Sequence, residues 1–377
     1  MIEEIAEEPA ELLQRAAALD IGKASLVCCV RVPHESRPGA RRQEVRTYDT
    51  VTPALLELRD WLICQGVTRV VMEATSAYWK PPFYLLEDDI ECWVVNARDV
   101  KNVPGRPKTD KLDAVWLCKL AERGMLRPSF IPGRPQRQLR DLTRYRRTLV
   151  QERSREKQRA EKLLEDAQVK LSSVISDIFG VSGRDMLAAL IAGQRDPYAL
   201  ADLARKSMRA KMSVLRQALT GHFTDHHAFL LGMMLDRTDA LTAQIDALTA
   251  RIEEAIAPFA AQVAQLDEIP GVGITTAQEI LAETGTDMSR FPTPGHLVSW
   301  AKFAPKARQS AGRAKAAATG KGSPWLGGTI GEAAVSAART QTFPGRPLQA
   351  DRQAPRQKTR PGCRRQLHPH HHLAPAV

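Results

Sequence analysis

Residues 18–30 read ALDIGKASLVCCV, and they are the clearest strand signal in the N-terminal part of the chain. Its two apolar runs, 18–23 and 25–30, are short and rich in strand formers, so together they predict a β-hairpin. Residues 43–51 then alternate polar side chains with strand formers and predict a third strand.

Helix and strand patterns alternate from there to residue 96. Residues 53–64 space their apolar side chains as a helix does, with Thr52 as the predicted N-cap and Pro53 in the first helical position. Residues 69–74 and 92–96 are apolar enough for buried strands, and residues 79–86 between them predict a helix. Three strands, a helix, a strand, a helix and a strand in this order predict a mixed α/β sheet domain.

Length, charge and cysteine content narrow the class of protein. The 377 residues indicate two or three domains, and a formal net charge of +11 favours a polyanionic partner such as nucleic acid. A solvated surface with a basic tail would give the same charge. The six cysteines show no paired CxxC spacing, which indicates reduced thiols rather than a zinc site.

The chain ends and the apolar runs argue against export and against a membrane. No run approaches the roughly 18 apolar residues that a membrane helix needs. The N-terminus reads MIEE and carries acids where a signal peptide carries bases. We therefore expect a cytoplasmic protein with no membrane partner.

The character of the sequence changes to helix near residue 136. Residues 137–169 are dense in Arg, Lys, Glu and Leu, which is typical of a long charged helix of the coiled-coil type. Residues 228–256 repeat apolar side chains at helical spacing, so the two helices could pair as an antiparallel arm or join subunits. We predict an α/β domain (14–135), a helical coiled-coil arm (136–257), a mainly helical domain (260–343) and a disordered tail (344–377).

Four acidic residues stand where a cluster could form. Asp20 ends an apolar run, and Glu73 ends a later buried strand. Asp110 and Asp113 follow Thr109, a possible helix cap, and their spacing places both on one helical face. Taken singly, each acid is more simply a turn residue or a helix N-terminal charge.

Taken together, the four acids favour a metal site. Carboxylates on neighbouring strands, faced by a helix with two more, can converge on one point. Enzymes of nucleic-acid phosphoryl transfer use such oxygen-only clusters to hold two Mg²⁺ or Mn²⁺ ions. The sequence therefore predicts a divalent-metal site.

Two further motifs lie in the C-terminal part. Residues 267–277 (DEIPGVGITTA) predict a helix end, a tight turn at Gly271 and Gly273, and a second helix, which is a helix-hairpin-helix element. Backbone N–H groups at such a turn can hold a DNA phosphate, although a plain helix–helix turn would look the same.

Ser310 lies in a basic stretch. The surrounding bases are Arg308, Arg313, Lys315 and Lys321. That positive field would suit DNA binding and a nucleophile that attacks a DNA phosphate, while the residues alone favour a surface-loop serine.

The residues around the four acids resemble the DEDD transposases of the insertion sequence one-ten family. The segments that carry the resemblance are LDIGK (19–23), VMEAT (71–75), NAR (96–98) and KTDKLDA (108–114). The resemblance implies an RNase H-like N-terminal domain, similar to Holliday-junction resolvases. It also implies that Asp20, Glu73, Asp110 and Asp113 are the metal-binding quartet.

The resemblance extends to the C-terminal part and covers roughly residues 14–343. It implies a transposase domain with a serine nucleophile, which Ser310 matches, although Ala311 stands where the family often has glycine. Ser323 is the alternative. It further implies a homo-oligomer, dimer or tetramer, in which the serine of one subunit meets the carboxylates of another. A structured guide RNA that pairs with donor and target DNA is implied as well.

The resemblance stops at Phe343. A back-translated tail read in a shifted frame can encode an apolar, family-like ending, so we hypothesise a frameshift near that residue. The histidines at 368 and 370–372 would then be its by-product rather than a metal site.

The sequence thus predicts a transposase or site-specific DNA recombinase. Two alternatives stay open: a structure-specific, metal-dependent endonuclease that uses water and no serine, and an inactive nucleic-acid-binding remnant.

Overall fold

The computed structural model describes residues 13–96, 110–305, 308–310, 313–315 and 319–340. The chain divides into two compact units, Met1–Ile131 and Pro132–Val377. The four-segment division drawn from the sequence stays a prediction, and its tail (344–377) lies outside the described residues, as does the proposed frameshift.

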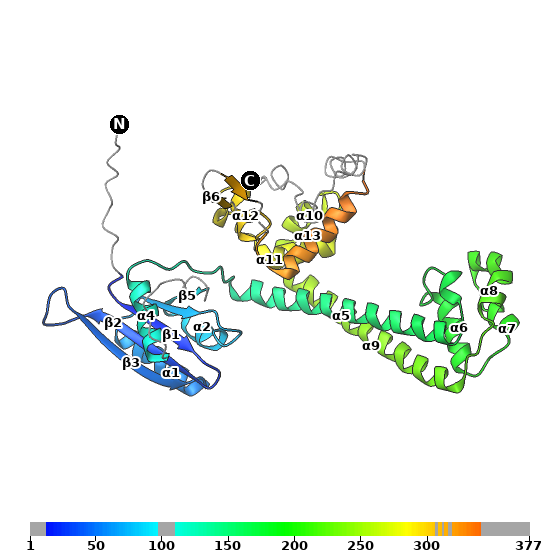
Figure 1. The fold of residues 1–377 in the computed structure, drawn as a ribbon, viewed down its shortest axis with the longest axis horizontal. Helices are drawn as coiled ribbons and strands as arrows, with labels where there is room; N and C mark the ends of the chain where they lie inside the picture. The colour runs from blue at the N-terminus through cyan, green and yellow to red at the C-terminus, as the bar shows by residue number, and fades with distance from the viewer. Residues whose placement is uncertain (1–12, 97–109, 306–307, 311–312, 316–318, 341–377) are drawn as a thin grey trace. The chain divides into compact units, whose positions relative to one another are not determined.

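The first unit is built on a five-stranded mixed sheet (Figure 1). Its strands are β1 (Ala16–Ile21), β2 (Ser25–Pro33), β3 (Arg41–Asp49), β4 (Arg69–Glu73) and β5 (Glu91–Val95). The order across the sheet is β3-β2-β1-β4-β5, with β2 antiparallel to both β1 and β3, and β4 parallel to both β1 and β5. The predicted mixed α/β sheet is confirmed.

The predicted hairpin joins β1 to β2 through a tight turn. The Gly22 N–H donates to the Ser25 carbonyl at 2.9 Å. A Cβ at Gly22 would lie 2.9 Å from that same oxygen, so the turn requires glycine.

In the described part of the first unit, three helices accompany the sheet. They are α1 (Thr52–Cys64), α2 (Lys80–Leu86) and α4 (Asp110–Glu122). The prediction that Thr52 caps α1 is wrong by one residue: Val51 is the N-cap and makes no side-chain cap bond, while a proline in the first turn needs no N–H partner.

The two faces of the sheet carry separate apolar cores, because successive strand side chains point to opposite faces. One face packs against α1 and α2, with Leu19, Leu55, Leu58, Met72 and Phe83 in its core. The other face packs against α4, with Ala16, Ala18, Val71, Ala114 and Cys118 in its core. The unit is therefore a layer of helices, the sheet, and a second helical layer.

The second unit begins with two long helices, α5 (Arg134–Asp166) and α9 (Asp225–Ile256), which run side by side (Figure 1). Leu139 packs near Ile252, Leu149 near Leu241, and Leu164 near Leu231. Residues further along α5 pack against residues earlier in α9, so the two helices are antiparallel.

Short helices close the far end of this pair. They are η1 (Leu171–Ser173), α6 (Val181–Ile191), α7 (Pro197–Asp202), η2 (Lys206–Lys211) and α8 (Met212–Ala218). One apolar core joins them to the ends of α5 and α9, with Leu171, Met186, Leu187, Leu200 and Leu215 fully buried. The broken sequence between the long helices is thus a small helical cap.

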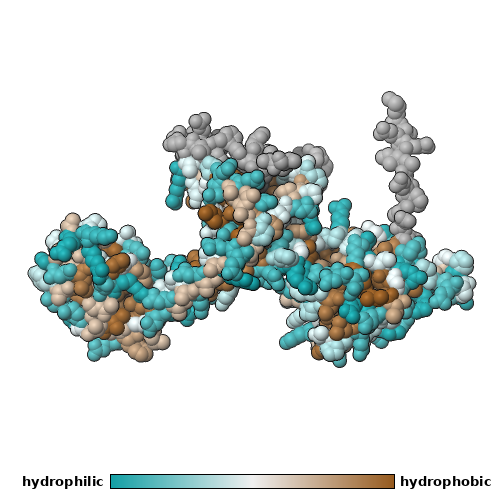
Figure 2. Space-filling model, turned by 180° about the vertical axis from the view of Figure 1, so that it is seen from behind, coloured by the Kyte–Doolittle hydropathy of each residue, from teal (hydrophilic) through white to brown (hydrophobic). Residues whose placement is uncertain are grey.

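The rest of the second unit is mainly helical. It contains η3 (Ala257–Phe259), α10 (Ala260–Asp267), α11 (Ile274–Thr284), η4 (Met288–Arg290), α12 (Pro294–Trp300), β6 (Arg308–Ser310), β7 (Arg313–Lys315) and α13 (Pro324–Ala337). Within the described residues, no helix combines the length and apolar character needed to cross a membrane. On the face shown in Figure 2, hydrophobic residues are interspersed with hydrophilic ones.

The five cysteines in the described part of the chain are free thiols. Cys28, Cys29 and Cys118 are buried in the two cores of the first unit, and Cys64 is exposed. Their packing explains these three cysteines as small apolar core residues.

Candidate active site

Asp20 and Glu73 come together at one edge of the sheet. Asp20 lies near the carboxyl end of β1, and Glu73 ends the parallel neighbour β4. The last registered pair between these strands is Leu19 with Met72, so Asp20 and Glu73 are the next residues along each strand. Both side chains are half-buried.

Strand alternation places both acids on the α4 side of the sheet. Asp20 shares its face with Ala16 and Ala18, and Glu73 shares its face with Val71, all of which pack in the core under α4. The two carboxylates therefore lie on the one face that a helix with two further acids covers.

The direction of α4 brings its first turn toward these acids. At its C-terminal end the Glu122 carbonyl accepts from the Leu13 N–H at 3.0 Å, and one turn earlier the Cys118 thiol donates to the Ala16 carbonyl at 3.5 Å. Moving back along α4 therefore means moving forward along β1. Four helical residues rise about 6 Å, which matches about two strand residues, so the start of α4 lies near the end of β1.

The buried face of α4 is the face that carries its acids. Asp113 lies one turn before buried Leu117, and Asp110 lies one turn before buried Ala114. Asp113 is half-buried, and the side chain of Asp110 lies outside the described residues. The backbone thus presents both positions toward the sheet edge that holds Asp20 and Glu73.

An ion-pair cluster fastens the opposite end of α4. The Glu122 carboxylate is 8% exposed, lies 2.7 Å from the Arg31 guanidinium of β2, and also pairs with Arg41 of β3. Charge-assisted hydrogen bonds of this kind are strong and also favour one relative orientation of the two groups. They hold α4 in the register that places its first turn at the acidic edge.

The donor set at this edge consists of carboxylate oxygens. Such ligands suit Mg²⁺ or Mn²⁺ and do not favour zinc. Among the side chains that the structure describes, which exclude Asp110, no three His, Cys, Asp or Glu residues lie close enough to hold a metal ion. The metal-binding quartet stays a prediction, and the chemistry of its donors fits the metal.

Ser310 lies at the end of a strand rather than in the loop that the sequence favoured. It is the last residue of β6 and pairs with Arg313, the first residue of β7. A two-residue connection follows it, so its position is set by the hairpin. The side chains of 308–310 and 313–315 lie outside the described residues, so the positive field around Ser310 stays a prediction; Lys321 is exposed.

The alternative serine, Ser323, has a structural role. It is the N-cap of α13, where its hydroxyl accepts from the Leu326 N–H at 3.4 Å. The same hydroxyl donates to the Glu283 carboxylate at 3.3 Å. These contacts account for a serine at position 323 without a role as a nucleophile.

The two glycines predicted to bind phosphate differ. Gly271 has φ +92°, and a Cβ there would lie 2.5 Å from the Ala333 carbonyl and 2.6 Å from the Ala337 nitrogen of α13. Close helix packing therefore explains Gly271. Gly273 is the exposed N-cap of α11, and a phosphate contact there stays a prediction.

Sequence reasoning missed a buried ion network that joins α5 to α11. Glu283 is 5% exposed and takes a two-point contact from Arg144, at 2.7 and 2.9 Å. Arg140 donates to the Glu283 carbonyl at 2.7 Å, and burial lowers the pKa of this guanidinium. The spacing of Arg140 and Arg144, four residues apart on one helical face, was the available signal.

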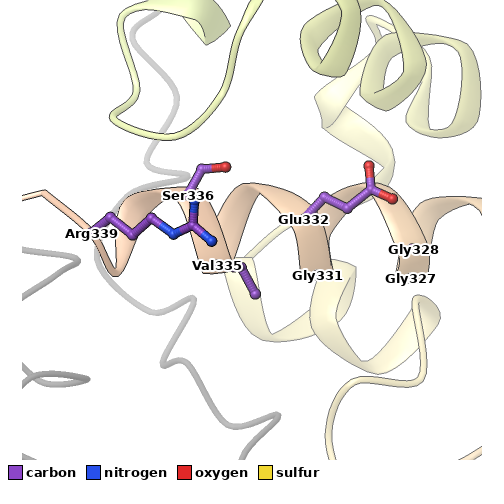
Figure 3. Close-up of a pocket in the computed structure, with 7 residues that line it drawn as sticks. All are labelled: Gly327, Gly328, Gly331, Glu332, Val335, Ser336 and Arg339. Carbon is purple, nitrogen blue, oxygen red and sulfur yellow. The ribbon is translucent and has the colours of Figure 1, made fainter. Parts of the chain in front are cut away.

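A hollow of about 480 Å³ lies along α13 (Figure 3). Its lining residues are Gly327, Gly328, Gly331, Glu332, Val335, Ser336 and Arg339. None of the predicted site residues lines it, and Glu332 is engaged by Arg147 at 2.5 Å. The hollow is therefore separate from the predicted chemistry.

Two family models match the chain. Residues 17–168 match a model of DEDD transposases of the IS110 type, described as a transposase, and residues 263–346 match the transposase IS116/IS110/IS902 family. The first match contains all four acids, and the second contains both glycines and both serines. No curated protein matches the chain.

Proposed function

Because the chain belongs to the IS116/IS110/IS902 family of transposases, which act on DNA, we propose that it cuts and rejoins DNA at a divalent-metal site. The proposed ligands are Asp20, Glu73, Asp110 and Asp113. The observation that carries this proposal is the register of β1 and β4, which makes Asp20 and Glu73 neighbours on the face covered by α4.

The sheet order supports an RNase H-like fold for the first unit. Three antiparallel strands are continued by two parallel ones, and Asp20 lies on the central strand β1. A carboxylate on a central strand, with a second on its parallel neighbour, is the arrangement we expect of that fold. The coiled-coil character of the α5–α9 pair and a helix-hairpin-helix role for α10 and α11 belong to the same proposal.

The residues of the first unit would hold and orient the metal. When bound, Mg²⁺ or Mn²⁺ would stabilise the negative charge that develops on the oxygens of the reacting phosphate. Strand pairing holds Asp20 opposite Val27 and Glu73 opposite Val95, and Glu122 holds α4, which carries Asp113, to β2 and β3. Rigid elements of this kind hold a catalytic constellation more precisely than loops do.

Ser310 is the proposed nucleophile. Its hydroxyl oxygen forms a bond to the DNA phosphorus while the bond from phosphorus to the leaving sugar oxygen breaks. The serine proton is released, and the leaving oxygen takes up a proton. The exchange keeps one phosphodiester bond throughout, so the reverse attack by a new strand end rejoins DNA without another energy source.

The proposal includes two partners. A structured guide RNA from the element would choose the donor and target by base pairing, and a second copy of the chain would complete the site. Under this proposal the serine of one subunit serves the carboxylates of another.

A covalent-adduct assay tests the chemistry. Purified protein is mixed with DNA and RNA from its element and with Mg²⁺, and the products are run on a denaturing gel. We expect a protein–DNA adduct that disappears in Ser310→Ala and in Asp20→Asn, and that persists in Ser323→Ala. Cleavage that survives in Ser310→Ala, without an adduct, would favour the water-using endonuclease.

The assay also separates the remaining alternatives. Salt-sensitive DNA binding with no metal-dependent cleavage by the wild type would favour the inactive remnant. Mixing Ser310→Ala with Asp20→Asn tests the shared site, because a site built from two subunits regains part of its activity in the mixture. If the mixture recovers no activity although each variant is folded and oligomeric, the site shared between subunits is contradicted. The proposed chemistry is not affected by that result.

A further inference from the structure

An exposed loop continues directly from Glu73. Residues 74–78 are all exposed, and they join the end of β4 to the start of α2. Tyr78 is 38% exposed and is a large aromatic side chain that the core does not take up. The loop therefore presents an aromatic ring five residues beyond a proposed metal ligand.

Backbone hydrogen bonds within the loop, and one to β5, restrict its conformation. The Thr75 N–H donates to the Glu73 carbonyl at 2.8 Å, and the Tyr78 N–H donates to the Thr75 carbonyl at 3.1 Å. At the start of the loop the Ala74 N–H donates to the Val95 carbonyl of β5 at 2.9 Å. Ser76 adopts φ +49°, a left-handed conformation that is costly for a residue with a side chain.

The residue after Tyr78 anchors the loop. Trp79 packs edge-to-face on Phe83, with 5.5 Å between ring centroids, and contacts the core between the sheet, α1 and α2. Because Trp79 is taken up by this aromatic cluster, its neighbour Tyr78 is left at the surface. Lys80, also exposed, adds a positive charge beside it.

We propose that Tyr78 forms a stacking platform for a nucleobase of a single-stranded DNA segment led to the carboxylate site. The inference rests on the proposed function, since that function places DNA at Asp20 and Glu73. An aromatic ring has few rotatable bonds, so it binds a base face at low entropic cost, and stacking tolerates every base. The ring would position an unpaired strand beside the site without reading its sequence.

Binding without metal tests the platform separately from catalysis. Full-length protein is titrated into a fluorescent single-stranded DNA oligonucleotide of mixed sequence, in chelator, at several salt concentrations. We expect Tyr78→Ala to weaken binding about tenfold or more. Tyr78→Phe keeps the ring and should bind like the wild type. The exposed Tyr145 and Tyr198 of the second unit are matched controls, and their alanine variants should bind normally.

The salt dependence gives a second signature. Loss of a stacked ring should leave the slope of log affinity against log salt unchanged, whereas loss of a phosphate contact lowers it by about one. Tyr78→Phe binding as weakly as Tyr78→Ala would overturn the inference, because the hydroxyl rather than the ring would then matter.

Photocrosslinking locates the contact directly. An oligonucleotide with 5-iodouracil should crosslink to Tyr78, identified by peptide mass spectrometry. Crosslinks confined to other residues would overturn the platform, even if binding itself is strong. A wild type that never cuts DNA with Mg²⁺ or Mn²⁺, yet crosslinks at Tyr78, would contradict the proposed function and leave the platform standing.

Discussion

Glu73 in the first unit and Glu283 in the second both lie at the end of an element with an apolar core side, but their surroundings differ. Glu73 is half-buried at the edge of a sheet whose two faces are packed by apolar side chains. Glu283 is 5% exposed and forms ion pairs with Arg144 and Arg140, and it accepts a hydrogen bond from the Ser323 hydroxyl. In the first unit apolar side chains pack both faces of the sheet, and the strand-end acids are the proposed metal ligands. In the second unit a buried acid is part of what holds the helices together.

The largest effect that this comparison predicts is on the second unit. Replacing Glu283 by alanine leaves the half-buried guanidinium groups of Arg140 and Arg144 without their carboxylate, which should cost about 3–5 kcal/mol of local stability. Hydrogen exchange of α11 and α13 amides would measure this loss. Glu254→Ala is the control, because Glu254 is 67% exposed in its pair with Arg251 and should cost about 0–1 kcal/mol. Equal losses of stability in the two variants would contradict a structural role for Glu283.

Glu122 tests whether the first unit also contains a structural acid. Its removal leaves Arg31 and Arg41 without their shared partner, and we expect a loss of about 3 kcal/mol. Urea unfolding followed by far-UV circular dichroism would measure this loss. DNA cutting should also fall, because α4 loses its ion pairs with β2 and β3. Glu44→Ala is the matched control, since its pairs with Arg42 and Arg46 are well exposed. Normal cutting by a folded Glu122→Ala protein would show that α4 needs no such clamp.

Ser76 tests whether strain is stored beside the carboxylates. Ser76→Gly removes the cost of the left-handed backbone and should raise stability by about 0.5–1 kcal/mol. Gln168→Gly in the second unit, at φ +61°, should gain a similar amount. If the strain at Ser76 positions the loop, DNA binding will weaken in Ser76→Gly and stay unchanged in Gln168→Gly. A loss of stability in both variants would contradict the argument.

The smallest expected effect is on the accessibility of the cysteine thiols in the first unit to solvent. Burial raises the pKa of the Cys92 thiol to about 12 and also raises that of Cys28, whereas Cys64 is exposed. At pH 8 iodoacetamide should label Cys64 first, with peptide mass spectrometry following each site. Since folding keeps the Cys92 proton bound, its contribution to stability is present below pH 9.0 and is lost as the pH rises toward 12. Labelling of Cys92 at the rate of Cys64 would show that this core admits water.

The order of elements in the first unit, and the places of Asp20 and Glu73 within it, could be predicted from the sequence. Alternation and helical spacing are local properties, imposed by the geometry of a few consecutive residues. The hairpin of residues 18–30 was predicted for the same reason, although its turn begins at Gly22, inside the run 18–23. Thr52 was misplaced by one residue because a proline-started helix needs no side-chain cap.

How distant segments meet could not be predicted from the sequence and is seen in the folded chain. The direction of α4 rests on Glu122 meeting Leu13 and Arg31, residues about a hundred positions away, and no local pattern encodes such a contact. The close approach of Gly271 to α13 and the grip of Arg144 on Glu283 are decided in the same way. Local steric preferences determine which residues form helices and strands. The contacts of buried charges and of closely packed glycines form only when these elements pack together.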